Sequence, residues 1–340
     1  MRWEPAVLLL VSLCVGIGIV SARGNNASKA TWTHLLLVAN QGDHSMSIID
    51  PDAGHELSRI TTRGVRAHEV MASRDGRFAY LPIYGDSGVG RAGTDGTNIE
   101  VVDLGKREIV RTIELGHGVR PHCVKLGPDG MLYVSAELDK ALDVIDPQQG
   151  KLTASIPTGQ PESHMFVISH DGRRAYTSNV GAGTVSVLDL VARKTVKVIP
   201  VAKIDQRISL SVDDRFVFTS DQEQPRLAII DTEKNEVTKW VSLPSLGYGT
   251  APTPDGHWLL VTMPATAQVA VVDLSKMKVV RTIEVPAHPV QILMRPDQPV
   301  AYVSCSGAGK VAVIDLKTWQ VAQTLDAGPG ADGLAWVVRP

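Results

Sequence analysis

This sequence of 340 residues lacks an excess of charge of either sign. It contains 34 Lys and Arg residues against 36 Asp and Glu residues, which leaves a formal net charge of -2. Proteins that attract nucleic acid or an anionic membrane over long distances present a large positive potential. We therefore expect no nucleic-acid partner, and we interpret most charged residues as a solvated surface.

The short motifs of several enzyme classes are also missing. The chain has no Ser-His-Asp order of a hydrolase, no CxxCH site for haem attachment and no paired CxxC sequence. The glycine-rich segment 85–98 lacks the Lys-Ser/Thr ending of a phosphate-binding loop. Any chemistry must therefore come from side chains that the fold brings together.

A long apolar run occurs near the N-terminus. Arg2 precedes the run AVLLLVSLCVGIGIV, and the small residues Ser21 and Ala22 follow it. This pattern predicts a signal peptide over residues 1–22 and a short linker over residues 23–32. We expect a periplasmic or secreted protein with no membrane span after cleavage. An uncleaved anchor is the alternative, but Gly16 and Gly18 weaken a spanning helix.

Aspartates that end short β-type runs recur with a period near forty residues. They are Asp50, Asp103, Asp146, Asp189, Asp231, Asp273 and Asp315, with successive spacings of 53, 43, 43, 42, 42 and 42. Units of this length with several short strands are typical of propeller blades, which bury their faces only against neighbouring blades. The sequence therefore predicts an all-β fold, a seven-bladed β-propeller over residues 33–340.

The two ends of the predicted propeller indicate how the ring closes. The segment HLLLVANQ resembles a second strand without an inner partner, and ADGLAWVV resembles an inner strand with nothing after it. We expect this C-terminal inner strand to join the N-terminal strands in one blade of a monomer. Cys123 and Cys305 then lie on blades that are not neighbours, so we expect two free, buried thiols.

Two of the units carry a resemblance to a known family. RAYTSNVGAGTVSVLDLVARKTVKVIPV and VAYVSCSGAGKVAVIDLKTWQVAQTLDAG are similar to the YVTN family of β-propeller repeats, and the resemblance extends over residues 33–340. Relatives include lactonase-like and streptogramin-lyase-like enzymes and the propeller domains of nitrous-oxide reductase and cytochrome cd1. The resemblance implies the fold, whereas this repeat frames proteins of many activities.

One position of the repeat is rich in polar residues. Five residues before each turn between first and second strands, the blades carry, in ring order, Asp332, His68, His122, His164, Gln206, Tyr248 and Val290. In a propeller this position lies where the chain enters the innermost strand, at the mouth of the central channel. We therefore expect the three histidines, on consecutive blades, to be near neighbours.

Three imidazoles on a rigid scaffold are a common first shell for a divalent transition metal such as Zn, Cu or Fe. Asp332 is a candidate fourth ligand or a partner that orients an imidazole, and Gln206 and Tyr248 are candidate ligand-binding residues. A metal-free binding ring and inherited histidines without a role are the alternatives. The copper cluster of nitrous-oxide reductase needs seven histidines, so the resemblance does not imply its activity.

Other residues near the predicted mouth are weaker candidates. Glu137 and Tyr248 are candidates for a general acid or base, although a solvated loop acid is the simpler interpretation of Glu137. Arg120 and Arg207 carry the planar fork that binds a carboxylate or phosphate. Residues 85–98 of the second unit are expected to form a polar surface flap, with a lid as an open question.

These observations favour three functions. The first is an exported binding or accessory protein that holds a metal ion or small ligand at the channel mouth. The second is an enzyme, a metal-dependent lactonase, lyase or oxidoreductase, that uses the same ring. The third is a scaffold for protein partners in which the histidines have no role.

Overall fold

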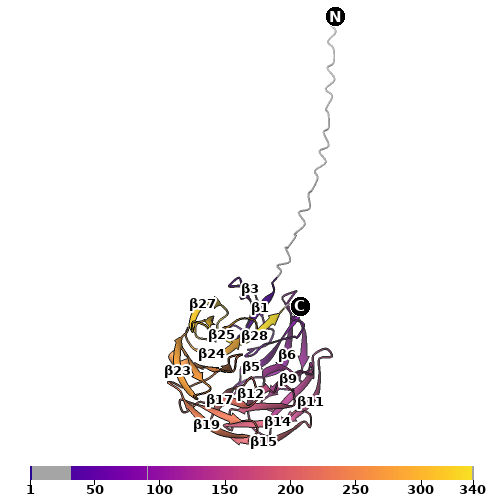
Figure 1. Cartoon of the computed structure of the whole chain (residues 1–340). Helices are drawn as coiled ribbons and strands as arrows, with labels where there is room; N and C mark the ends of the chain where they lie inside the picture. The colour runs from indigo at the N-terminus through magenta and orange to yellow at the C-terminus, as the bar shows by residue number, and fades with distance from the viewer. Residues whose placement is uncertain (2–31, 90, 339–340) are drawn as a thin grey trace. The chain divides into compact units, whose positions relative to one another are not determined.

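The structure is a computed structural model that describes Met1, residues 32–89 and residues 91–338. Its folded part is a ring of seven four-stranded antiparallel sheets (Figure 1), which confirms the predicted all-β, seven-bladed propeller. Residues from Trp32 onward form one compact unit. The predicted signal peptide and most of the linker lie outside the described residues. Within the described residues, no helix is long and apolar enough to span a membrane.

Each blade has four strands, which follow one another from the channel outward. Blade one contains β28 (Ala331–Val338), β1 (His34–Asn40), β2 (Ser45–Asp50) and β3 (His55–Thr61). Blade two contains β4 (Met71–Ala72), β5 (Phe78–Gly85), β6 (Asp95–Asp103) and β7 (Glu108–Glu114). Blade three contains β8 (Pro121–Leu126), β9 (Leu132–Ala136), β10 (Ala141–Asp146) and β11 (Lys151–Pro157). Blade four contains β12 (Ser163–Ile168), β13 (Arg174–Asn179), β14 (Thr184–Asp189) and β15 (Lys194–Pro200).

The remaining three blades follow the same order. Blade five contains β16 (Asp205–Leu210), β17 (Phe216–Asp221), β18 (Arg226–Asp231) and β19 (Glu236–Ser242). Blade six contains β20 (Thr250–Pro252), β21 (Trp258–Met263), the 3-10 helix η1 (Pro264–Thr266), β22 (Gln268–Asp273) and β23 (Lys278–Glu284). Blade seven contains β24 (Pro289–Met294), β25 (Val300–Cys305), β26 (Lys310–Asp315) and β27 (Gln320–Asp326).

The hydrophobic core lies between the blades. Successive side chains of a strand point to opposite faces, so Leu35 and Leu37 of β1 pack towards blade two while Leu36 and Val38 pack towards blade seven. All four are fully buried. A sheet with two apolar faces needs a neighbour on each side, which explains why the units close into a ring.

The ring closes as the sequence predicts. β28 pairs with β1 from His34 opposite Val338 to Asn40 opposite Ala331, so the last strand is the inner strand of blade one. Cys123 and Cys305 are free and buried, as expected. The turn role of the repeated aspartates is also confirmed, and Asp189 Oδ1 shows it by accepting the backbone N–H groups of Val191 and Ala192.

The segment 85–98 is less of a loop than the sequence suggested. β5 extends to Gly85 and β6 begins at Asp95, because these two residues pair after a bulge. A Cβ atom on Gly96 would lie 1.6 Å from the backbone oxygen of Ile83, so only glycine allows this approach. The connecting flap is thus shortened to about residues 86–94, with a bridge between Gly88 and Arg91.

Candidate functional site

The channel mouth brings the three histidines together. His122 and His164 lie at the starts of the inner strands β8 and β12, and His68 lies just before β4. The ring centroids of His122 and His164 are 3.6 Å apart, and those of His68 and His122 are 4.9 Å apart. The rings are tilted by 34° and 30°, so the three imidazoles form a stack with His122 in the middle.

A carboxylate holds each outer histidine of the stack. Asp332 Oδ2 lies 3.0 Å from Nδ1 of His68, and Glu137 Oε1 accepts a short hydrogen bond from Nδ1 of His164. Since an ionised carboxylate only accepts hydrogen bonds, Nδ1 carries the proton in both rings. In the neutral form of either ring, Nε2 then carries the lone pair. This orientation by a carboxylate is the one typical of histidines that ligate metals or act as bases.

The central histidine, His122, is neutral. Burial lowers its pKa well below the ordinary value, and the neighbouring His164, His68 and Arg207 lower it further. Its Nδ1 is buried and has no hydrogen-bond partner among the described residues, and the same is true of Nε2 of His68. These two nitrogen atoms are the unsatisfied donors or acceptors of the stack.

Glu137 is part of this site and is not a solvated loop acid. Its side chain is fully buried, which corrects the simpler interpretation from the sequence. The hydroxyl of Tyr84 donates to Glu137 Oε2 at 2.9 Å, and Arg120 Nη1 lies 3.6 Å from the same oxygen. Burial and the Glu137 charge raise the pKa of Tyr84, so the phenol remains a donor. The Tyr84 ring also contacts His68 edge-on, with centroids 4.8 Å apart.

A buried ion triad forms the base of the site. Arg207 of β16 lies 2.7 Å from Glu69 Oε1 and 2.5 Å from Asp332 Oδ1. The exposed fractions of the three side chains are 5%, 2% and 4%. Burial alone would raise the pKa of Asp332, but the Arg207 charge and the His68 hydrogen bond outweigh it and lower that pKa. The triad therefore links blades one, two and five and fixes the carboxylate that orients His68.

The histidines line a pocket of about 330 Å³ at the mouth. Gln206, Tyr248 and Val290 complete its wall as the ring predicts, and the flap contributes Val89 and Arg91. Burial raises the pKa of Tyr248, so its phenol is neutral. Arg66 and Arg91 also line the mouth, and neither forms an ion pair with any described residue.

The two arginines predicted to bind ligands have internal partners instead. Arg207 lines the mouth pocket, but its guanidinium pairs with Glu69 and Asp332. Arg120 donates through Nε and Nη2 to Asp95 Oδ1 at 3.1 and 3.0 Å, at the base of the flap. Their roles as ligand-binding residues stay predictions, although each now has a structural role.

Sequence reasoning missed Tyr84 and Glu69. Tyr84 is the last residue but one of β5, directly before the flap, and the repeat phase gives no indication that its hydroxyl turns towards Glu137. Glu69 follows His68 directly, so it lies one position outside the phase that identified the ring. A search for acids adjacent to ring positions would have found Glu69.

The arrangement of the three histidine rings does not resemble a site in which all three bind one metal ion. Three imidazoles that ligate one ion must point their nitrogen atoms at a common point, whereas these rings lie beside one another in a row, with planes tilted by 30° and 34°. Among residues 32–89 and 91–338, no group of three His, Cys, Asp or Glu side chains is arranged to hold a metal ion. The three-histidine metal centre stays a prediction.

A comparison with protein-family models finds a likeness over part of the chain. The family model described as the cytochrome D1 heme domain matches residues 31–165, a segment that contains all three histidines. No curated protein matches the chain. The predicted resemblance to the cytochrome cd1 propellers is thereby confirmed, while membership of the YVTN repeat group stays a prediction.

Several solved structures share the fold. Hydrazine synthase from Kuenenia stuttgartiensis has a TM-score of 0.71 at 20% identity and covers 83% of this chain and 92% of its own. The periplasmic gluconolactonase PpgL of Pseudomonas aeruginosa has a TM-score of 0.71 at 16% identity, with coverages of 90% and 99%. The dihydro-heme d1 dehydrogenase NirN, in complex with DHE, has a TM-score of 0.59 at 19% identity, with coverages of 88% and 65%. At these identities the likeness shows the fold alone.

Proposed function

We propose that this chain is an exported binding propeller whose channel mouth holds an iron tetrapyrrole through the histidine stack. The observation that carries the proposal is a buried, neutral His122 between two histidines that carboxylates anchor through Nδ1. A tetrapyrrole supplies four ligands of its own iron, so it needs only one or two imidazoles from the protein. A stack suits this requirement better than it suits a bare ion that needs three converging nitrogens.

The residues at the mouth fit such a group. His122 Nδ1 and His68 Nε2 are buried nitrogens without hydrogen-bond partners among the described residues, so either could hold the iron of a bound group. Arg66 and Arg91 add positive charge at the mouth and pair with no acid of the described chain, which favours a ligand that carries carboxylates. Bound iron would supply redox or ligand-binding chemistry. The family match to a heme domain over the same residues supports this choice.

The residues of this chain have separate tasks in the proposal. His122 or His68 would hold the iron, and Asp332 and Glu137 keep Nδ1 of the flanking rings protonated. Tyr84 holds Glu137 in place and remains a neutral donor. Gln206 and Tyr248 offer polar contacts at the opposite wall of the mouth.

The test is an absorption titration of the purified protein with ferric haem as the probe. We expect saturable one-to-one binding with a shifted haem band, and His122→Ala should weaken it at least tenfold. His170→Ala is the matched control, because His170 is exposed on a turn beside Asp214. Equal binding by wild type and His122→Ala would reject the proposal. Stoichiometric retention of Zn²⁺ or Cu²⁺ alone would favour a metal centre instead.

A second candidate is a lactonase. His164, with Glu137 on Nδ1, has the arrangement of a general base, and a gluconolactonase shares the fold over 90% of this chain. Hydrolysis of gluconolactone that is lost in His164→Ala, without any added haem, would support this function. We also propose that the protein is exported, is a monomer and recruits a protein partner. Periplasmic recovery of the full chain from an exporting host tests export.

A further inference from the structure

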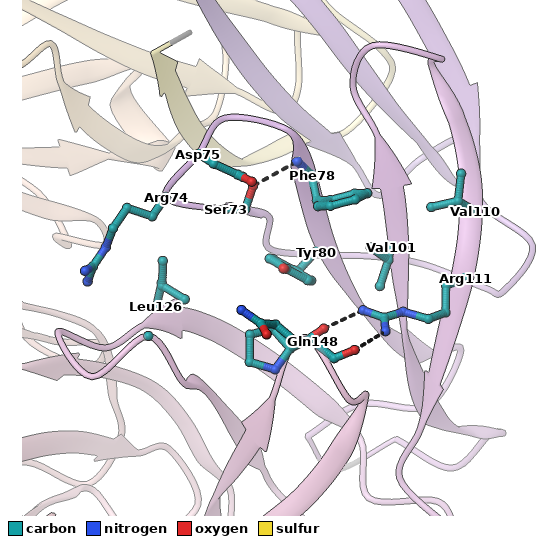
Figure 2. A pocket seen from close by; sticks show the side chains of 12 residues that line it. Ser73, Arg74, Asp75, Phe78, Tyr80, Val101, Val110, Arg111, Leu126 and Gln148 are labelled. Atoms are coloured by element: carbon teal, nitrogen blue, oxygen red, sulfur yellow. Dashed lines mark hydrogen bonds between the residues drawn. The ribbon is translucent and has the colours of Figure 1, made fainter. Parts of the chain in front are cut away.

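A second pocket, of about 650 Å³, lies between blades two and three (Figure 2). It is at the end of the blades opposite the histidines, because His122 is the second residue of β8 and Leu126, in the pocket wall, is its last. Phe78, Val101 and Val110 of blade two form the apolar wall that faces Leu126. The volume falls within the range of about 300–1,000 Å³ that is typical of small-molecule sites.

Tyr80 places an unused hydroxyl group in this pocket. The residue as a whole is 4% exposed, and its hydroxyl forms no hydrogen bond with the other described residues. The equivalent hydroxyl in blade three, on Tyr133, donates to Asp129 at 2.9 Å. In blade two the acid at that position, Asp75, instead accepts hydrogen bonds from Ser73 Oγ and the Arg77 N–H. Tyr80 lines the pocket, and its oxygen is not one of the fully buried atoms that lack a partner, so the hydroxyl is open to the pocket. It is therefore free to donate to an acceptor that enters from outside the chain.

The rim of the pocket has a surplus of positive charge. Arg111 donates to the backbone oxygens of Pro147 and Gln148, and Arg74 donates to those of Gly127 and Pro128 (Figure 2 shows the Arg111 bonds). These neutral oxygens fix both guanidinium groups across the blade boundary without cancelling their charge. Neither arginine forms an ion pair within the described part of the chain. Among the described residues that line the pocket, Asp75 is the one acid, and its Oδ1 is already hydrogen-bonded.

We propose that this pocket between the blades binds a small amphiphilic carboxylate with a flat apolar body. The apolar body lies between Phe78, Val101 and Leu126. The carboxylate accepts a hydrogen bond from Tyr80 and faces the charge of Arg111. The site is separate from the channel mouth, so it does not depend on the function proposed above.

The test is calorimetric titration of the full chain with 2-naphthoate as the probe. We expect saturable binding to one site, and weaker binding of the neutral analogue 2-naphthamide. Tyr80→Phe removes only the hydroxyl and should weaken 2-naphthoate binding roughly fivefold, the effect of one hydrogen bond. Arg111→Gln should also weaken it and reduce its salt dependence.

Tyr133→Phe is the matched control, because it removes the equivalent hydroxyl from a site outside the pocket. It should leave 2-naphthoate binding unchanged. Val110→Trp, at a partly exposed position on the rim, should block binding while the thermal midpoint stays near that of wild type. The proposal is overturned if wild type shows no saturable binding, or if Tyr80→Phe binds the probe as tightly as wild type does.

Discussion

Replacing Arg207 by methionine is expected to lower the free energy of unfolding by about 4 kcal/mol. The change removes one charge from a buried triad and leaves Glu69 and Asp332, which are 2% and 4% exposed, as unpaired carboxylates. Breaking a buried ion pair by removing one partner costs about 3–5 kcal/mol. Asp332 keeps hydrogen bonds from His68 and Gln41, whereas Glu69 has no other charged partner in the described chain. We therefore expect a loss of stability near the middle of this range.

The expected loss corresponds to a measurable shift in thermal midpoint. With an unfolding entropy of about 2 cal/mol/K per residue, a folded unit of about 300 residues loses roughly 6 °C for 4 kcal/mol. Circular dichroism during heating measures the midpoint. Lys203→Met is the control, because Lys203 forms an exposed ion pair with Glu223 and its loss should barely change the midpoint.

A third variant separates charge from packing. Arg207→Met combined with Glu69→Gln and Asp332→Asn removes all three charges and should recover much of the lost stability, because no unpaired buried charge remains. If Arg207→Met alone unfolds within 1 °C of wild type, the triad does not carry the buried charge that the structure assigns to it.

Three further predictions concern stability and the site. Asp205 is fully buried, its carboxylate oxygens have no hydrogen-bond partner on any other described residue, and burial raises its pKa well above the ordinary value. Because the carboxyl ionises more readily in the unfolded chain, the free energy of unfolding falls as the pH rises above about 4. Asp205→Ser introduces the residue found at the equivalent position of blade four, and it should stabilise the protein by about 1 kcal/mol at pH 7. Urea unfolding should show that this gain becomes progressively smaller towards pH 4. Asn179→Ala should cost about 2 kcal/mol in the same assay, because its side chain joins Ser163 and Ser186 by bonds of 2.8 and 2.9 Å; a loss as small as that of an exposed alanine substitution would contradict this role. Tyr84→Phe should leave the thermal midpoint within a few degrees of wild type but weaken haem binding about threefold to tenfold. The reason is the loss of a hydrogen bond of about 1 kcal/mol to Glu137, the carboxylate that holds His164. Haem affinity equal to that of wild type would show that Glu137 needs no such support.

The fold could be predicted almost completely from the sequence, because the residues that mark each strand end lie close together in the chain. Each blade repeats the same turn chemistry, so Asp189 and its six equivalents mark the strand ends without knowledge of the rest of the chain. Ring closure follows from the incomplete segments at the two ends, and the pairing of β28 with β1 confirms it. The flap was misjudged because the bulge at Gly96 lengthens β5 and β6, and the sequence shows only a cluster of glycines there.

The site could be predicted only in part. Equal repeat phase brings His68, His122 and His164 together, since the inner strands converge on one axis. Whether their rings converge on a point or stack depends on the partner of each Nδ1, and those partners come from other blades or other strands. Glu137 reaches His164 from the end of β9 in the previous blade, and Asp332 reaches His68 from the last strand. Such contacts arise from tertiary packing, which the spacing of motifs does not encode.

The central claim is that a neutral His122 lies between two imidazoles whose Nδ1 atoms are held by carboxylates. Nitrogen-15 NMR of the histidine rings in the ligand-free protein between pH 5 and 8 tests it most directly. The account predicts that His122 stays neutral throughout this range, and that His68 and His164 show the Nδ1-protonated tautomer whenever they are neutral. Titration of His122 near its ordinary pKa of about 6.5, or Nε2-protonated His68 and His164, would contradict it.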